Sequence, residues 1–164
     1  MSRSNRPARS SLGKDLAFIL LAAVVVAIDQ TTKHLIRANL MVGESIPQGG
    51  FIRLTYVTNT GGAFGLFANQ TFLMILTATI GIIALILYYW YPPFENAWLR
   101  SSLALQLGGA VGNLIDRVRL GYVTDFIDVR VWPVFNIADS AIVVGAGIFI
   151  FFMLFLAKDE RQKG

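Results

Sequence analysis

Carboxylates dominate the part of the sequence that could do chemistry. Four of the seven aspartates lie between Gly108 and Ser140, and long apolar segments flank this stretch on both sides. These four are Asp116, Asp125, Asp128 and Asp139. An ionisable side chain beside a membrane-length apolar helix is costly, so its presence indicates a function. We predict that Asp125 and Asp139 form a catalytic pair at the membrane surface.

Two carboxylates held close together share one proton, because both cannot ionise cheaply. The ionised member can take a proton from water while the protonated member polarises a peptide carbonyl, which allows hydrolysis without a metal or a covalent intermediate. The chain has no cysteine and one histidine, His34, which stands near no serine that connects to it. We therefore expect no thiol nucleophile, no metal site and no cofactor.

The residues alone leave the choice of pair open. Asp139 is expected in the outer turn of the last apolar helix, and Asp125 in the loop that leads into it, so a loop that folds back brings them together. Asp125 and Asp128 are an alternative, although positions three apart in an extended segment point to opposite faces. Aspartates that only cap helix ends are a further alternative.

Hydropathy predicts the elements that must position these residues. The chain is 55% hydrophobic and 15% charged with a mean hydropathy of +0.60, whereas a soluble domain carries roughly 25% charged residues. We predict a single membrane-embedded domain over residues 1–164, an all-α integral membrane protein with four transmembrane helices. The spans are expected at about residues 16–37, 71–91, 98–118 and 136–157.

Basic residues set the expected orientation. They cluster at the two ends of a chain with net charge +4, which is typical of cytoplasmic flanks rather than of nucleic-acid binding. Residues 1–14 are expected to be a cytoplasmic tail before an uncleaved first span, although a basic head and an apolar run also describe a signal peptide. With both termini cytoplasmic, the first and third connections lie outside.

The segments between the predicted helices also have patterns that predict structure. Residues 51–57, FIRLTYV, are β-branched and aromatic and predict a strand in the first outer connection. Residues 121–133 are expected to form an aromatic outer loop that covers the site. The aromatic side chains of this loop are Tyr122, Phe126 and Trp132. The tyrosine and tryptophan cluster at 88–91 is typical of an interfacial belt.

Five sequence blocks resemble lipoprotein signal peptidase, also called signal peptidase II. The blocks are DQTTK at 29–33, TNTGGAFG at 58–65, GNLIDR at 112–117, VTDF at 123–126 and FNIADS at 135–140. The resemblance implies a multi-pass aspartyl endopeptidase of the bacterial inner membrane, with four transmembrane helices and a small extracytoplasmic β-structured region. It implies cleavage of diacylglyceryl-modified prolipoproteins just before the lipidated lipobox cysteine, near the outer leaflet.

The resemblance also assigns the site residues. It implies Asp125 and Asp139 as the catalytic dyad, surrounded by polar residues that bind substrate or support the site. The surrounding residues are Asn59, Asn113, Asp116, Arg117, Asn136 and Asp29. Arg117 is expected to pair with Asp116 or a lipid phosphate, and Asp29 is open to a structural N–H or lysine partner. The implied partners are prolipoproteins, membrane lipid and globomycin-type inhibitors, and nothing requires more than a monomer.

Two other functional classes compete with this interpretation. A small transporter could use the carboxylates as a proton path, but such a path places carboxylates at several depths. Here the strong candidates all fall at the outer end of the predicted spans. Another kind of intramembrane aspartyl protease would place both aspartates deep within helices, which the expected loop position of Asp125 argues against.

Overall fold

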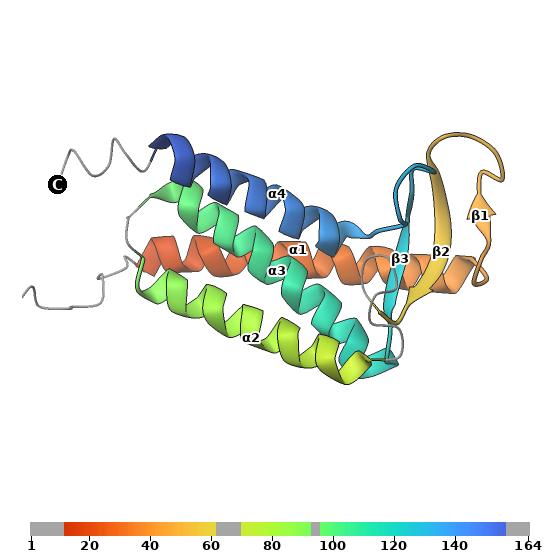
Figure 1. Cartoon of the computed structure of the whole chain (residues 1–164), viewed down its shortest axis with the longest axis horizontal. Coiled ribbons are helices and arrows are strands. Elements are labelled where there is room, and N and C mark those ends of the chain that lie inside the picture. Colours follow the sequence, from red (N-terminus) through yellow and green to blue (C-terminus); the bar gives the residue numbers. More distant parts are fainter. Residues whose placement is uncertain (1–11, 62–69, 93–95, 157–164) are drawn as a thin grey trace, which may run out of the picture.

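Four helices lie side by side, and a small sheet covers one end of the bundle (Figure 1). The computed structural model describes residues 12–61, 70–92 and 96–156. The helices are α1 (Leu12–Asn39), α2 (Thr71–Trp90), α3 (Ala97–Leu120) and α4 (Ile137–Phe151), which continues as the π-helical turn η2 (Phe152–Leu156). The strands are β1 (Ser45–Ile46), β2 (Arg53–Asn59) and β3 (Val123–Asp128). The predicted tail, residues 1–14, lies largely outside the described residues.

Helix α3 is the centre of the bundle and packs against α1, α2 and α4. Glycines allow the close approach, because a side chain would collide with a neighbouring backbone. A Cβ at Gly108 would lie 2.7 Å from the Ala22 carbonyl oxygen of α1, and one at Gly145 of α4 would lie 2.7 Å from the Ser102 carbonyl oxygen of α3. Glycines of α3 and α4 therefore allow α1 and α4 to pack closely against α3.

The helix ends nearest the sheet are defined by specific caps. Helix α3 stops at Gly121, whose φ of 81° suits glycine, and its N–H bonds the Arg117 carbonyl. Helix α4 begins with a capping box, in which Asn136 and Asp139 each accept the other's backbone N–H. The chain therefore turns sharply from α3 into β3 and starts α4 at a fixed point. The start of α1 and the end of α4 lie at the opposite end (Figure 1).

The sheet is antiparallel with strand order β1-β2-β3. The strand predicted at 51–57 is present, although it runs from Arg53 to Asn59. The prediction that residues 121–133 form only a loop is wrong, because β3 occupies part of them and aligns Asp125 opposite Val57. Phe126 of β3 is buried with Ile36 of α1 and with Leu40, which directly follows α1, so packing against this end of α1 fixes the segment as a strand.

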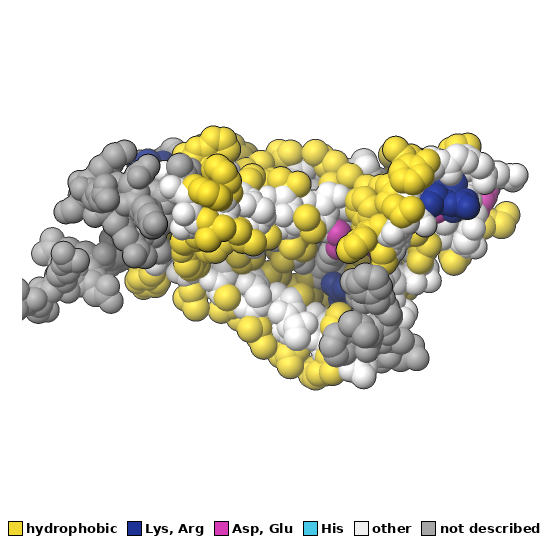
Figure 2. Space-filling model, turned by 45° about the horizontal axis from the view of Figure 1, so that its top comes forward, with side chains coloured by type: hydrophobic (Ala, Val, Ile, Leu, Met, Phe, Trp, Pro, Cys, Tyr) yellow, Lys and Arg dark blue, Asp and Glu magenta, His cyan; other side chains and the backbone are white. Residues whose placement is uncertain are grey.

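Two of the described helices are long and apolar enough to cross a membrane, α2 and the combined α4–η2 helix from Ile137 to Phe155. The four helices occupy the predicted ranges within a few residues, and four membrane spans remain a prediction. Figure 2 shows hydrophobic side chains over the bundle, with acidic and basic side chains in a hollow near the sheet end. The aromatic residues at 88–91 do not all lie at the surface. Tyr89 is buried and stacks on Phe18 with ring centroids 3.9 Å apart, whereas Trp90 and Tyr91 are exposed.

Candidate active site

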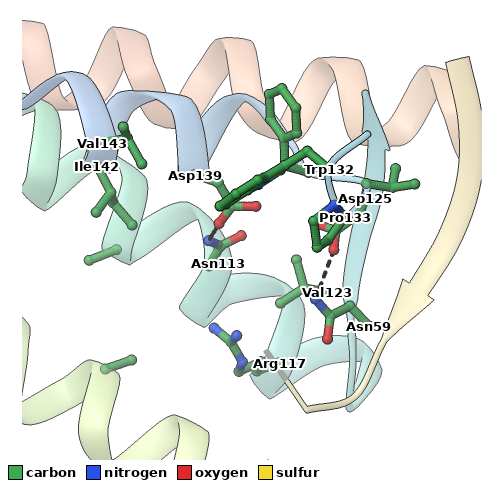
Figure 3. Close-up of a pocket in the computed structure, with 14 residues that line it drawn as sticks. Asn59, Asn113, Arg117, Val123, Asp125, Trp132, Pro133, Asp139, Ile142 and Val143 are labelled. Carbon is green, nitrogen blue, oxygen red and sulfur yellow. Dashed lines mark hydrogen bonds between the residues drawn. The ribbon is translucent and has the colours of Figure 1, made fainter. Parts of the chain in front are cut away.

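A cavity of about 450 Å³ lies where α3, α4 and the sheet meet. Asp125 reaches it from β3 and Asp139 from the first turn of α4 (Figure 3). The two residues predicted as the pair therefore face one space, although they come from different elements. Much of the remaining lining is apolar and includes Val123, Ile142 and Val143.

Asp125 is held by two side-chain amides. Its Oδ1 accepts from Nδ2 of Asn136 at 2.7 Å, and its Oδ2 accepts from Nδ2 of Asn59 at 2.8 Å. Burial, together with the charge of nearby Asp139, raises the pKa of Asp125 to about 7, while the two amide bonds act in the opposite direction. A proton can therefore reside on this carboxyl near neutral pH.

Asp139 is held by one side-chain amide and one backbone N–H. Its Oδ1 accepts from Nδ2 of Asn113 at 2.8 Å, and its Oδ2 accepts the backbone N–H of Asn136 at 3.2 Å. Asn136 also donates to Oδ1 of Asn113 at 3.1 Å. Neutral amides thus connect the two carboxylates through Asn136 and Asn113. Two carboxyl groups that face one cavity, one of which can hold a proton near neutral pH, have the chemistry that acid–base catalysis requires.

The alternative pair of Asp125 and Asp128 is not formed. Asp128 points to the other face of β3, where it accepts from Nε of Arg53 at 3.1 Å and from the Thr55 hydroxyl at 2.9 Å. The Arg53 guanidinium holds the pKa of Asp128 below its usual range. Asp128 is therefore an ionised partner of Arg53, away from the cavity.

Arg117 and Trp132 complete the described cavity wall. Arg117 approaches from α3 and Trp132 from the segment between β3 and α4 (Figure 3). The predicted pairing of Arg117 with Asp116 is not formed, because Asp116 lies on a different face of α3 and bonds Lys33 and the Thr124 N–H instead, and a lipid phosphate as partner of Arg117 stays a prediction. Of the three aromatic residues predicted to cover the site, only Trp132 lines the cavity.

Asp29 and Asp116 lie behind the cavity, buried around an ammonium group. Nζ of Lys33 lies 2.9 Å from Oδ2 of Asp29 and 3.3 Å from Oδ2 of Asp116, and all three side chains are 0–1% exposed. Arg37 contributes a second cation, with Nη1 3.8 Å from Oδ1 of Asp116. The alternative of a structural N–H or lysine partner for Asp29 is confirmed, since Asp29 binds Lys33 and the Ala138 N–H, whereas no role was predicted for Arg37. The four-residue spacing of Asp29 and Lys33 within one helix was the available signal.

A metal ion has no evident site among the described residues. No three or more histidine, cysteine, aspartate or glutamate side chains come together within residues 12–61, 70–92 and 96–156 in an arrangement that could hold one. The carboxylates of the cavity instead have amide donors on their oxygens.

Comparisons with known proteins agree with this geometry. The family model described as signal peptidase (SPase) II matches residues 21–155. The lipoprotein signal peptidase of Moorella thermoacetica is 52% identical over 150 residues, which cover 90% of this chain and 99% of that protein. The lipoprotein signal peptidase of Caldanaerobacter subterraneus is 49% identical over 84% of this chain and 95% of that protein.

Two solved structures have the same fold. Both are described as bacterial membrane enzymes determined by the in meso method. One has a TM-score of 0.80 at 33% identity and covers 91% of this chain and 92% of its own. The other has a TM-score of 0.79 at 31% identity and covers 94% of this chain and 99% of its own. The chain belongs to the signal peptidase II family.

Proposed function

We propose that this protein is a membrane aspartyl endopeptidase that removes the signal peptide from diacylglyceryl-modified prolipoproteins, cutting just before the lipidated cysteine. The observation that carries the proposal is the position of Asp125 and Asp139, which face one cavity and are held by neutral amides. The relatives named lipoprotein signal peptidase, which match most of the chain, support the choice of substrate.

The chemistry follows from one shared proton. Near neutral pH, Asp125 and Asp139 together carry one negative charge and one proton, because the pKa of Asp125 is raised to about 7. The ionised carboxylate takes a proton from a water molecule, and that water attacks the scissile carbonyl carbon. The protonated carboxyl donates to the carbonyl oxygen. As the tetrahedral intermediate collapses, a proton passes to the leaving amine and the roles exchange.

The surrounding residues have distinct proposed tasks. Arg117 and Asn59 line the cavity and donate to carbonyl oxygens of the bound substrate. Asn113 and Asn136 hold the two carboxylates in place through their amide groups. Trp132 shields the reacting bond from bulk water. Asp29 and Asp116 act from behind the cavity, through the backbone of α4 and β3.

The position of the cavity suits a substrate that leaves the membrane there. We place all four helices across the bacterial inner membrane, with both termini in the cytoplasm and the sheet at the outer surface. The cavity, at the sheet end of the bundle, then lies near the outer leaflet, where a signal helix ends. Its apolar wall contacts the diacylglyceryl group and membrane lipid. Globomycin-type inhibitors occupy the same cavity, and the protein works as a monomer.

The test is cleavage of a diacylglyceryl-modified prolipoprotein by the purified protein in detergent, followed by gel shift and by mass spectrometry of the new N-terminus. We expect wild type to release a product that begins at the lipidated cysteine, and the folded Asp139→Asn variant to release none. The same prolipoprotein without its diacylglyceryl group should remain intact. Cleavage by both proteins would move the chemistry elsewhere, and cleavage by neither, with folded protein, would contradict the proposed function.

A further inference from the structure

The backbone next to each proposed catalytic aspartate is held by a second aspartate. Oδ1 of Asp29 accepts the N–H of Ala138 at 3.0 Å, and Ala138 directly precedes Asp139. Oδ2 of Asp116 accepts the N–H of Thr124 at 3.0 Å, and Thr124 directly precedes Asp125. Each bond uses a main-chain donor, so it fixes the peptide segment itself. Asp29 and Asp116 therefore hold the two segments from which the catalytic side chains extend.

Lys33 connects these two holding aspartates. Its Nζ lies 2.9 Å from Oδ2 of Asp29, 3.3 Å from Oδ2 of Asp116 and 2.9 Å from Oδ1 of Asn113. An ammonium group has three N–H donors, and these three acceptors use all of them. The side chain is fully buried. One cation thus joins α1 to the segments that carry both members of the pair.

Lys33 also sets the orientation of the Asn113 amide. Oδ1 of Asn113 accepts from Lys33 at 2.9 Å and from Nδ2 of Asn136 at 3.1 Å, so Nδ2 of Asn113 faces Asp139. The reversed amide would place an NH₂ group against the ammonium and an oxygen against the carboxylate, which is unfavourable on both sides. Lys33 therefore determines, from behind the cavity, that Asn113 donates to Asp139.

We propose that Lys33 is a positioning residue for the catalytic pair, which fixes the spacing of Asp125 and Asp139 and keeps Asn113 directed at Asp139. This inference rests on the proposed function. The competing explanation is that Lys33 only neutralises two buried carboxylates so that the helices can pack. The two explanations differ in what they predict for folded enzyme, since only positioning changes the turnover and the pH profile of molecules that have folded.

The charge of Lys33 acts on the pair together with other charged groups. These are Asp29 and Arg37 from α1, and Asp116 and Arg117 from α3, besides the two aspartates themselves. The positive charge of Lys33 lowers the pKa of Asp125. Its removal therefore raises that pKa, and the pH at which the pair loses its proton moves upward.

The decisive variant is Lys33→Met combined with Asp29→Asn. Lys33→Met alone would leave two buried carboxylates without their ammonium, whereas the double change removes one positive and one negative charge and leaves Arg37 with Asp116. We expect kcat to fall by about 10- to 100-fold, as for loss of groups that orient a reactive side chain. KM should stay within about twofold, because the residues that line the cavity keep their identity.

The control is Arg53→Met combined with Asp128→Asn, which removes a partly buried ion pair at the far side of β3. Its kcat and pH profile, per folded molecule, should equal those of wild type. If the Lys33 double variant does not fold, Lys33→Gln replaces it, since the amide still donates but carries no charge. A lower kcat is expected for Lys33→Gln, together with an alkaline limb at higher pH, because this variant removes the positive charge and keeps Asp29.

The results separate this inference from the proposed function. If wild type cleaves, Asp139→Asn does not, and the folded Lys33 variants match wild type in kcat and pH profile, Lys33 is purely structural and the inference fails. If folded wild type cleaves no prolipoprotein, the proposed function fails first. The inference is supported only when the Lys33 variants fold, bind substrate with nearly unchanged KM and turn over slowly, with the alkaline shift in Lys33→Gln.

Discussion

Two pairs of aspartates lie near one another in the fold, one in the cavity wall and one behind it, and their partners differ in kind. Asp125 and Asp139 accept bonds from neutral amides and face a cavity. Asp29 and Asp116 surround the Lys33 ammonium and are almost wholly buried. A cation balances a carboxylate's charge, whereas a neutral amide orients the carboxylate and favours its charged form without adding a balancing charge. The comparison shows how one residue type serves two purposes, a pair that we propose to be reactive and a buried pair that accepts backbone N–H groups.

The arrangement also separates two demands that conflict at an active site. A reactive carboxylate must exchange protons with substrate, so a permanent cation in direct contact would oppose its work. Buried carboxylates that hold a backbone require a partner, because an unpaired buried charge is strongly destabilising. Placing Lys33 one amide away from the cavity meets both demands, since Asn113 lies between the ammonium and Asp139.

The largest expected effect follows from loss of one member of the cavity pair. Asp125→Asn keeps the shape but removes the charge and the proton, so cleavage should fall by about 10²- to 10⁴-fold while folding is retained. Asp128→Asn is the matched control, because Asp128 lies three positions along the same strand and binds Arg53 instead. A rate assay on prolipoprotein measures both. An active Asp125→Asn enzyme, or an inactive but folded Asp128→Asn enzyme, would show that the wrong pair was chosen.

A steric change tests the buried pair. A Cβ at position 112 would lie 2.6 Å from Oδ2 of Asp29. Gly112→Ala should therefore displace Asp29 and destabilise the fold by about 1–3 kcal/mol. Gly147→Ala in α4 is the control, since a Cβ there meets nothing within 4 Å. Thermal unfolding in detergent should show a lower Tm for Gly112→Ala alone. Equal Tm values would mean that the close approach of Asp29 to α3 contributes little.

A smaller expected effect, on the pH dependence of cleavage, tests whether Asp125 carries the shared proton. Activity requires one proton on the pair, and with the pKa of Asp125 at about 7 we expect kcat/KM to fall as the pH rises above about 7. The Asn59 bond lowers that pKa, so Asn59→Ala should raise it and move the alkaline limb to higher pH.

Asn39→Ala serves as the control for this profile. Asn39 is exposed at the end of α1, where its side chain bonds only its own helix at the Leu35 carbonyl. Its kcat/KM profile, measured from about pH 5 to about pH 9, should overlay that of wild type. A limb that moves to lower pH in Asn59→Ala would contradict the sign of the argument.

The smallest expected effect is that of metal removal. Acid–base catalysis by two carboxylates needs no metal, and the sequence offers no cysteine and one histidine as ligands. Prior dialysis against EDTA should leave the cleavage rate unchanged. A rate that disappears in EDTA and returns with zinc would mean that the cavity pair is a metal site, and the contrast between the two pairs would need another explanation.

The sequence predicted the helices well and the site in part. Long apolar runs made the four helices evident, and the capping pattern of Asn136 with Asp139 is local, so it can be read from adjacent residues. The strand around Asp125 was missed because VTDFID is short and becomes regular only by pairing with β2 and packing on α1. The resemblance to a family named the residues around the pair, but it did not indicate which of them contact one another.

Buried ion pairing was the least predictable feature. Asp116 and Arg117 are neighbours in sequence, yet they lie on different faces of α3, one at Lys33 and one at the cavity, so adjacency suggested an ion pair that the fold does not make. The true partner, Lys33, is 83 positions away and is reached only when α1 packs on α3. Contacts of this kind depend on helix packing, which spacing within one segment cannot reveal.

The most direct test of the account is infrared spectroscopy of the purified enzyme, which detects protonated carboxyl groups, during titration from about pH 5 to about pH 9. We predict a protonated carboxyl signal in wild type that disappears as the pH rises through about 7, where Asp125 titrates. The folded double variant Asp125→Asn/Asp139→Asn should lack this signal. If the signal persists in the double variant, the proton resides on another carboxyl such as Asp29 or Asp116, and the assignment of the reactive pair is contradicted.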